Sequence, residues 1–486
     1  MKQIAELEPQ IVWSIFEEIT RVPRPSKKEE RIRAHVIAFA EAHGLAYRSD
    51  AKGNIVVIRE AAAGRESEPA LILQSHMDMV CEKDADVEID FEQDPIQAYV
   101  DGEWVKARGT TLGADCGIGM ALQMAALIDP SLRAPKIEAL FTVDEEQGLT
   151  GAMNLGHDML SGTRMINLDS EDEGEIFIGC AGGIDTIGTM TYVPEKVQNA
   201  ADWQACEIRV GGLHGGHSGD DIEKGFANAN KLMTRLLWNL ARQCGLRISS
   251  LDGGNLRNAI PRDACALVAL PVAQMSAADG LFHMLSAAFA EEFKMTEPAL
   301  QCSFSAVDRS VEAFLPLEVQ SRLLNLLYAL PHGVMAMSMT LPGLVETSTN
   351  LASVKMPEPG KIVITTSQRS SVESAKRDIA DRIASVFALA QVDAVHTDGY
   401  PGWAPNPDSP LVHKASEIYL QMFGNSPKIR AIHAGLECGL FLSRYPGLDM
   451  ISTGPTLRGV HSPAERVEIA SVAKVWDYLR QLIESV

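Results

Sequence analysis

Two kinds of apolar pattern alternate along the first third of the chain. Helix-like patterns, the first of them amphipathic around Ile15, Phe16 and Ile19, cover residues 9–20, 27–43 and 113–128. Short apolar runs predict four strands at residues 54–59, 70–74, 136–143 and 164–168. Helices and strands that alternate in this way indicate an α/β layer.

The pattern changes after the glycine-rich segment GCAGG at residues 179–183, and a second domain is predicted to begin there. In this part of the chain the predicted strands are residues 186–193, 206–210 and 361–367, and the predicted helices are residues 225–243 and 372–389. The Pro- and Gly-rich residues 400–410 indicate another boundary. Two further helices are predicted beyond this boundary, at residues 413–423 and 472–483.

Composition limits the number of domains and the kinds of partner. A chain of 486 residues exceeds one hydrophobic core, so two or three domains are expected. Its net charge of -21 would repel a phosphate backbone and anionic lipid, which argues against nucleic acid and membranes as partners. The amino terminus carries no secretion signal, no uncharged apolar run reaches about 20 residues, and the eight cysteines are scattered. We therefore expect a cytoplasmic protein with free thiols.

An imidazole and several carboxylates directly follow the predicted strands. His76 ends the second strand, Glu146 lies just after the third, and Asp169 follows the fourth. Sites in open α/β sheets form outside the carboxyl ends of the strands, so these side chains are expected to gather at one edge. Asp78, two residues after His76, is close enough to orient its imidazole or a neighbouring group.

Five candidate metal ligands stand among small or turn residues: His76, Asp115, Glu146, Asp169 and His461. Two imidazoles and three carboxylates suit two borderline cations such as zinc if one carboxylate bridges them. Asp115 is the best bridge, because the Gly-rich turn TLGADCGIG lets backbone and metal approach closely. For Glu146 and Asp169 taken singly, an exposed acid explains the sequence equally well, whereas the whole set favours a dinuclear site.

Glu145 is the candidate general base. Successive residues of an extended chain face opposite sides, so a metal-binding Glu146 leaves Glu145 free. Hydrolysis requires such a carboxylate, because bound cations lower the pKa of water towards about 7 and a base then moves the proton to the leaving amine. A solvated loop acid is the alternative reading of Glu145.

Eight phrases of the sequence together resemble the M20 family of dinuclear zinc peptidases, in register through nearly the whole chain: SHMD, GTTLGADCGIG, TVDEEQG, NLDSEDEGEIFIGCAGG, GGHSG, GGNLRNAIPR, HAGLECGLF and GVHSP. Within the family the chain most resembles the bacterial aminoacyl-histidine, or Xaa-His, dipeptidases. The resemblance implies metal binding by the five candidate ligands, a general base at Glu145 and a supporting acid at Asp78.

The resemblance also implies an architecture. A zinc-peptidase catalytic domain, an α/β/α sandwich, is expected from residues 1–185 and 399–486, with an inserted α+β lid domain at residues 186–398. Such an insertion explains why four ligands fall between positions 76 and 169 while His461 follows nearly three hundred residues later.

The lid is expected to contribute groups that bind the substrate. The motif GGHSG implies that His217 stabilises the oxyanion of the tetrahedral intermediate. Asn258 and Arg369 match family positions around the substrate carboxylate, where an arginine offers a planar two-pronged donor. In the second part of the catalytic domain, a turn that would border the substrate's side-chain pocket contains His433, Gly435 and Glu437.

Two positions depart from the family pattern. Cys116 follows the bridging aspartate where the dipeptidases typically have asparagine, and the family usually makes this peptide bond cis. A metal ligand and an oxidation-sensitive thiol are alternative roles for Cys116, although five ligands already fill the site. The extra acid Asp144 leaves the choice between Glu145 and Glu146 dependent on register alone.

The candidate site and the resemblance together predict a metal-dependent dipeptidase that hydrolyses unblocked dipeptides. The resemblance alone implies that these include Xaa-His and carnosine-like substrates. The expected cofactors are two divalent ions, Zn²⁺ or in its place Mn²⁺ or Co²⁺, with a zinc-bridging hydroxide as nucleophile. The alternatives are an amidohydrolase that deacylates N-acyl amino acids and a metal-binding scaffold that has lost catalysis. Family precedent favours a homodimer, and the expected partners are small peptides.

Overall fold

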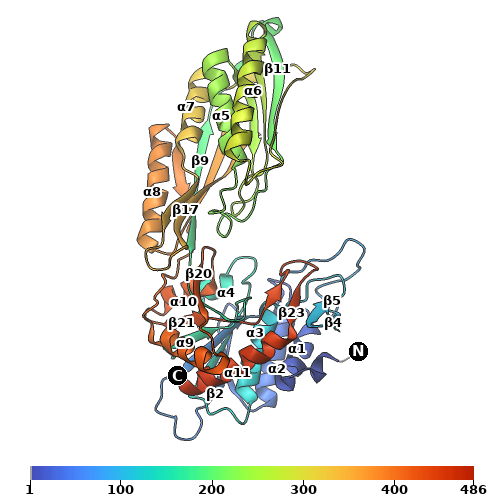
Figure 1. Cartoon of the computed structure of the whole chain (residues 1–486), viewed down its shortest axis with the longest axis vertical. Coiled ribbons are helices and arrows are strands. Elements are labelled where there is room, and N and C mark those ends of the chain that lie inside the picture. The colour runs from blue at the N-terminus through green and yellow to red at the C-terminus, as the bar shows by residue number, and fades with distance from the viewer. Residues whose placement is uncertain (1–2) are drawn as a thin grey trace. The chain divides into compact units, whose positions relative to one another are not determined.

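The computed structural model describes residues 3–486, and the chain divides into two compact units (Figure 1). Unit 1 consists of Met1–Cys180, Trp403–Ala431 and Leu436–Val486, and unit 2 consists of Ala181–Gly402 and Ile432–Gly435. The chain changes unit close to the two expected boundaries, after residues 185 and 398, and the short segment 432–435 was not expected in unit 2. The assignment of the units as catalytic and lid domains stays a prediction.

An eight-stranded sheet forms the centre of unit 1. Its strands, in spatial order, are β1 (Ala46–Ser49), β2 (Ile55–Arg59), β6 (Ile137–Thr142), β3 (Leu71–His76), β7 (Arg164–Asn167), β21 (Asp449–Ser452), β8 (Glu175–Cys180) and β20 (Lys428–Ile432). The central strands β6, β3, β7 and β21 run parallel to one another. They are almost entirely buried, as expected for parallel strands covered on both faces. Parallel pairing brings their carboxyl ends to one edge.

Helices cover this sheet. The helices of unit 1 are α1 (Gln10–Thr20), α2 (Glu30–Ala42), α3 (Ala114–Ile128), α4 (Thr150–Met153), α9 (Pro410–Phe423), α10 (Glu437–Arg444) and α11 (Ile469–Ser485). Helix α3 packs on β3 and β6 and is covered by α1, so nearly all of its residues are buried. From the carboxyl-terminal part of the chain, α9 packs on β21 and α11 packs on α9. A small antiparallel sheet completes the unit with β4 (Ala98–Asp101), β5 (Trp104–Ala107), β22 (Leu457–Arg458) and β23 (Arg466–Glu468).

Unit 2 is an antiparallel nine-stranded sheet with four long helices. Its strands are β14 (Gln301–Ala306), β11 (Trp203–Gly211), β13 (Ala264–Pro271), β12 (Arg247–Gly253), β17 (Val345–Glu358), β18 (Lys361–Ser370), β9 (Gly182–Thr191) and β19 (Asp393–His396), with β16 (Gly333–Met337) paired to β17. Strands β10 (Glu195–Lys196) and β15 (Ala313–Phe314) form a separate pair. The helices, drawn along the sheet in Figure 1, are α5 (Ala229–Cys244), α6 (Met275–Glu292), α7 (Leu317–Ala329) and α8 (Glu373–Leu389).

The core of unit 2 lies between its sheet and its helices. Alternate residues of β11 show why: Cys206, Ile208 and Val210 are buried in the shared cluster, whereas Glu207 and Arg209 point away from it. The predicted helices and strands of both units are present, and the mixed α/β class is confirmed. Within residues 3–486, no helix combines the length and apolar character needed to cross a membrane.

Candidate dinuclear metal site

The five candidate ligands come together within unit 1. His76 ends β3, Glu146 follows β6 and Asp169 follows β7, so the parallel strands deliver three of them to the same edge. Asp115 reaches this edge from the first turn of α3, and His461 from the loop between β22 and β23. The fold therefore brings the ligands together at one edge, although they are far apart in the sequence.

Asp115 lies between the two imidazoles. Its Oδ1 is 3.2 Å from His76 Nε2, and its Oδ2 is 3.1 Å from His461 Nε2. On the outer sides, His76 Nε2 is 3.3 Å from Asp169 Oδ1, and His461 Nε2 is 3.1 Å from Glu146 Oε2. The cluster thus has two halves, one around His76 and one around His461, that share a single carboxylate.

The donor atoms fit two divalent cations. The side chains of Glu146 and Asp169 are only 5% and 7% exposed. Glu146 Oε1 nevertheless has no hydrogen-bond partner among the described residues, and Asp169 Oδ1 has only its 3.3 Å ion pair with His76. Buried carboxylate oxygens without donors are costly, and a cation in each half would satisfy them. Imidazole nitrogens and carboxylate oxygens are also the ligands that zinc accepts.

The ionisable groups of the cluster depend strongly on one another. Hydrogen bonds to Asp115 and Glu146 raise the pKa of His461 to about 11. Burial raises the pKa of Asp115, but hydrogen bonds from His461 and His76 outweigh burial and hold that pKa below its usual value. Burial raises the pKa of Asp169 to about 6. Divalent cations would replace the shared protons, because a metal-bound imidazole is neutral.

Asp78 supports the site in both ways that the sequence suggests, by contact with the imidazole of His76 and by orienting a neighbouring segment. His76 Nδ1 lies 3.1 Å from the main-chain oxygen of Asp78 and 3.5 Å from the carboxylate. The carboxylate itself accepts hydrogen bonds from the backbone N–H groups of Glu145 and Glu146, at 3.0 and 3.2 Å, and from Ser26 Oγ at 2.7 Å. Asp78 therefore fixes the loop after β6, while its carbonyl oxygen orients the imidazole so that Nε2 faces the cluster.

The two neighbouring glutamates differ in their surroundings. Glu146 contacts His461 and belongs to the half that contains Asp115. A carboxylate oxygen of Glu145 lies near ligand atoms of His76 and Glu146, within 4.8 Å. Burial raises the pKa of Glu145 well above its usual value. This geometry supports Glu146 as the ligand and leaves Glu145 beside the cluster.

Two buried residues that the sequence did not single out hold the loop before Asp115. Glu465 accepts hydrogen bonds from the backbone N–H groups of Leu112, Gly113, Ala114 and Asp115 at 2.8, 3.0, 2.7 and 3.2 Å. Arg24 donates to the carbonyl oxygens of Met77, Asp78 and Gly113. Together they fix the two backbone segments that bear His76 and Asp115.

Gly113 is the residue that allows the loop this path. Its φ of 68° lies in the left-handed region, which favours glycine. A Cβ atom there would lie 2.6 Å from Nη2 of Arg24. Glu465 and Arg24 thus clamp the backbone before Asp115. In the sequence, only the glycine-rich turn and Glu465, an acid four residues after His461, pointed to this clamp.

Glu437 lies beneath the ligands rather than at an open surface. It is fully buried, and its Oε2 accepts hydrogen bonds from Gln74 Nε2 at 2.6 Å and Thr142 Oγ1 at 2.8 Å. Burial raises the pKa of Glu437 to about 8. Its expected place beside a substrate side chain stays a prediction. Its hydrogen bonds connect β3 and β6 close to His76.

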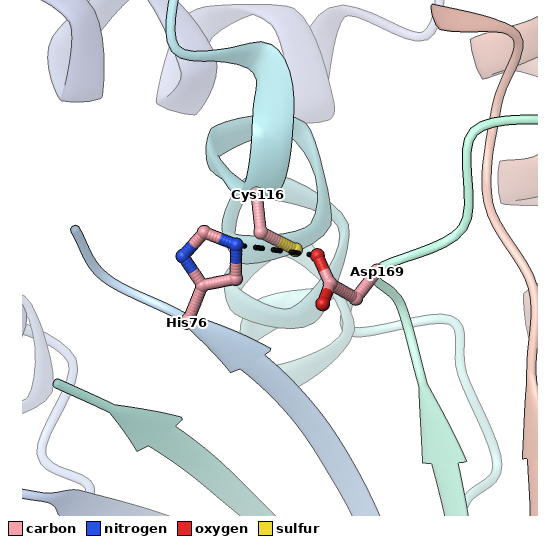
Figure 2. Close-up of side chains that lie close together, drawn as sticks. All are labelled: His76, Cys116 and Asp169. Atoms are coloured by element: carbon pink, nitrogen blue, oxygen red, sulfur yellow. Dashed lines mark ion pairs between the residues drawn. The ribbon is translucent and has the colours of Figure 1, made fainter. Parts of the chain in front are cut away.

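Cys116 points into the cluster (Figure 2). The figure shows its sulfur beside the imidazole of His76 and the carboxylate of Asp169. Its peptide bond with Asp115 is cis, as expected from the family pattern. The residue is 2% exposed, and burial raises the pKa of its thiol well above the usual value. The low exposure and the raised pKa of the thiol argue against an oxidation-sensitive role, which requires an accessible thiolate.

In unit 2, His217 and Asn258 line one cleft of about 500 Å³. Nδ1 of His217 accepts a hydrogen bond from the backbone N–H of Asp220 at 3.2 Å. This N–H donor favours the neutral tautomer with its proton on Nε2, while the carboxylate of Asp220, 3.4 Å from Nδ1, favours a proton on Nδ1; the shorter contact is the one with the N–H. Ser218 N–H donates to the main-chain oxygen of Asn258 at 2.7 Å, which joins the two segments. 

The remaining predicted residues of unit 2 form a buried polar group. Arg369, on β18, donates from Nη1 to Tyr400 Oη at 2.9 Å, and its Nε has no hydrogen-bond partner within the described part of the chain. His433 Nε2 lies 2.7 Å from Ser348 Oγ, and burial lowers the pKa of His433 to about 4. A Cβ atom on Gly435 would lie 2.9 Å from the Tyr400 ring.

Two imidazoles, a shared carboxylate and a neighbouring free glutamate at the end of a parallel sheet define a metal-dependent hydrolase site. The chain belongs to peptidase family M20/M25/M40, whose profile matches residues 72–485. The family predicted from the sequence phrases is therefore confirmed.

Individual relatives cover the chain fully. It is 40% identical over 486 residues to the cytosol non-specific dipeptidase of Escherichia coli strain K12, which covers 100% of this chain and 99% of that protein. The crystal structure of aminoacylhistidine dipeptidase from Vibrio alginolyticus is similar with a TM-score of 0.92 and 40% identity, over 100% of this chain and 98% of that chain. A tripeptidase from Staphylococcus aureus shares the fold with a TM-score of 0.57 and 15% identity, over 98% of each chain.

Proposed function

We propose that this protein is a metal-dependent dipeptidase that hydrolyses unblocked dipeptides, including Xaa-His and carnosine-like substrates. The observation that carries the proposal is Asp115, shared between His76 and His461 with Glu145 beside the pair. The names of the two relatives at 40% identity, a non-specific dipeptidase and an aminoacylhistidine dipeptidase, support the substrate class.

The five ligands would hold two divalent cations, Zn²⁺ by preference, with Mn²⁺ or Co²⁺ able to replace it. When bound, the cations supply a Lewis acid for the scissile carbonyl and lower the pKa of water. The His76 half would use His76 and Asp169, and the His461 half would use Glu146 and His461, with Asp115 common to both.

Glu145 is assigned the proton transfer. Its backbone N–H is held by Asp78, and its carboxylate is not part of the pair formed by Glu146 and His461. Glu145 would take the proton of the attacking water and deliver it to the amine that leaves. Burial raises the pKa of Glu145, which favours its role as the group that accepts the proton.

His217 is assigned the stabilisation of the oxyanion. The N–H donor at its Nδ1 favours the neutral ring with its proton on Nε2, and this is the form that donates a hydrogen bond to negative charge. A donor of this kind contributes about 3 to 4 kcal/mol to the transition state.

Two polar groups of unit 2 are assigned to the ends of the dipeptide. Arg369 would bind the substrate carboxylate through its guanidinium, with Asn258 nearby, and Tyr400 would hold the guanidinium in position. The turn expected to border the side-chain pocket contains His433, Gly435 and Glu437.

The test of the mechanism is Glu145→Ala, with Glu145→Gln as the isosteric partner. Both variants are expected to lose at least about a hundredfold in kcat while they retain two zinc ions per chain, measured by elemental analysis. Near-normal hydrolysis of a histidine dipeptide by Glu145→Ala would show that another group moves the proton. Chelation should abolish activity, and Zn²⁺, Mn²⁺ or Co²⁺ should restore it.

A panel of dipeptides and N-acetyl amino acids tests the reaction itself on metal-reconstituted enzyme. Faster turnover of the N-acetyl compounds would favour the amidohydrolase alternative. Metal binding without turnover of either class would favour a scaffold that has lost catalysis.

We also propose that the enzyme is a cytoplasmic homodimer. The name of the Escherichia coli relative supports the compartment. Sedimentation velocity tests the dimer, and a monomer at working concentration would contradict it.

A further inference from the structure

The loop that carries His217 is long for a connection inside a compact unit. It covers residues 212–228, between β11 and α5, and contains neither a helix nor a strand (Figure 1). Loops of more than about 12 to 15 residues without secondary structure are uncommon and are usually functional. Contacts from outside the loop must hold it in one shape if His217 is to act at a fixed place.

Glu297 joins the two ends of this loop. It lies in the turn between α6 and β14, and it is only 3% exposed. Its Oε2 accepts a hydrogen bond from the N–H group of His214 at 2.6 Å, and its Oε1 accepts one from the N–H group of Ala227 at 2.9 Å. One carboxylate thus closes a ring of backbone in which His217 lies. Hydrogen bonds to an ionised carboxylate are roughly twice as strong as those between neutral groups.

Other contacts bring the same two ends together. The rings of His214 and Phe226 are stacked, with their centroids 4.3 Å apart. Gly212, at the start of the loop, has a φ of 70°, and a Cβ atom there would lie 2.0 Å from the main-chain oxygen of Ala299. The start of the loop therefore packs directly on the turn that bears Glu297, and both ends are held at this one place.

The tip of the loop is fixed by separate hydrogen bonds. The N–H group of His217 donates to Asp221 Oδ2 at 2.7 Å, and that of Ser218 donates to the main-chain oxygen of Asn258 at 2.7 Å. Glu297 binds the backbone three residues before His217 and ten residues after it. Its carboxylate would therefore act on the imidazole through the backbone of the loop.

We propose that Glu297 is a positioning residue: it ties the two ends of the loop so that His217 is held where it donates to the oxyanion. The inference rests on the oxyanion role proposed for His217. A donor stabilises a transition state when it is already aimed at the developing charge, and a donor on a loosened loop contributes less. Loss of Glu297 should therefore lower kcat and leave zinc binding unchanged, because the five candidate ligands all lie in unit 1.

Hydrogen–deuterium exchange tests the tie without reference to activity. Glu297→Gln keeps the volume of the side chain but presents an NH₂ group to one of the two N–H donors, and Glu297→Ala removes both acceptors. The amide hydrogens of His214 and Ala227 are expected to exchange at least about tenfold faster in both variants than in wild type. The amides of β11 should stay protected, which would show that unit 2 remains folded. Unchanged exchange at His214 and Ala227 in both variants would overturn the proposal.

A double-mutant cycle on kcat tests whether Glu297 acts through His217. Glu297→Gln is expected to lower kcat about tenfold with less than about a threefold change in KM. It should have no further effect once His217 is replaced by alanine. Equal losses in the two backgrounds would overturn the proposal and leave the oxyanion role of His217 intact. A normal kcat in His217→Ala alone would overturn that oxyanion role and this inference with it.

Glu291→Gln is the matched control. It makes the same change of charge on α6, where the side chain of Glu291 is 75% exposed and pairs with Lys294 at 2.6 Å. This variant is expected to match wild type in amide exchange, kcat and zinc content. Losses equal to those of Glu297→Gln would assign the effect to net charge and overturn the tie.

Discussion

Glu465→Gln tests whether the backbone clamp before Asp115 controls metal binding. In the wild type each carboxylate oxygen accepts two N–H groups, Oε2 from Leu112 and Gly113, and Oε1 from Ala114 and Asp115. Glutamine keeps one oxygen and replaces the other by an NH₂ group. That NH₂ group would face two N–H donors, so two of the four hydrogen bonds are lost.

The structure sets the size of the effect. Hydrogen bonds to a charged group are worth about 1.5 to 3 kcal/mol each, so the two lost bonds correspond to about 3 to 6 kcal/mol. Glu465 is only 2% exposed, so water cannot easily replace the lost acceptor. If the loop relaxes and recovers all but the energy of one such hydrogen bond, about 2 kcal/mol remains as a penalty on Asp115. Zinc affinity would then fall about thirtyfold.

The assay is competition with a chromophoric zinc chelator, together with kcat at saturating zinc. Glu468→Gln is the control, because Glu468 lies in β23 just beyond the clamp and its carboxylate makes no hydrogen bond or ion pair with the described residues. Glu465→Gln is expected to bind zinc more weakly and to recover much of its activity in excess zinc. Equal zinc affinity in the two variants would refute the clamp.

Three further predictions concern unit 2. Lys231 Nζ donates to the carbonyl oxygens of Leu327, Tyr328 and Leu330 at the end of α7, so Lys231→Met should destabilise unit 2 by about 2 to 3 kcal/mol in denaturant unfolding, and an unchanged midpoint would contradict this. Burial lowers the pKa of His433 from 6.5 to about 4, so the unfolded chain binds more protons between these values. Stability is then complete above pH 6.5 and falls by up to about 3 kcal/mol as the pH drops towards 4. The melting temperature of His433→Gln should vary less over this range than that of wild type, and identical slopes would exclude His433 as the cause. Arg369→Lys should raise KM for dipeptides about tenfold or more with a smaller change in kcat, because lysine cannot form a two-pronged contact; an unchanged KM would show that Arg369 does not bind substrate.

The helices and strands that could be predicted from the sequence are those whose apolar residues form a recognisable local pattern. Strand β3 begins with the apolar run Leu71–Leu73 and β6 is mostly apolar, and both are buried in a parallel sheet as the pattern indicates. Strand β17 shows why other elements were missed. Its residues 347–350 are Thr, Ser, Thr and Asn, and all four are buried. Contacts such as that of Asn350 Nδ2 with the main-chain oxygen of Ala259 satisfy them, and no local pattern reports such partners.

The residues of the candidate site likewise include some that the sequence predicts and others that only the structure reveals. Ligands such as His76 and Asp169 follow apolar strands, and this local feature was enough to predict their gathering at one edge. Arg24 and Glu465 act on main-chain atoms of distant segments, so their residue types carry no signal of that role. Asp78 was correctly linked to the site, but its main contacts with Glu145 and Glu146 depend on the loop after β6, which only the folded chain defines.

The position of β21 affects the order in which the protein can fold during synthesis. This strand comes from Asp449–Ser452, yet it lies between β7 and β8, which the ribosome completes some 270 residues earlier. Until β21 emerges, β7 has an unpaired edge, and such edges invite association with other chains. All strands of the large sheet in unit 2 come from residues 182–396, so this sheet can form first. A nascent chain would therefore carry the complete large sheet of unit 2 while the sheet of unit 1 still has open edges, which can associate with other chains until β21 arrives.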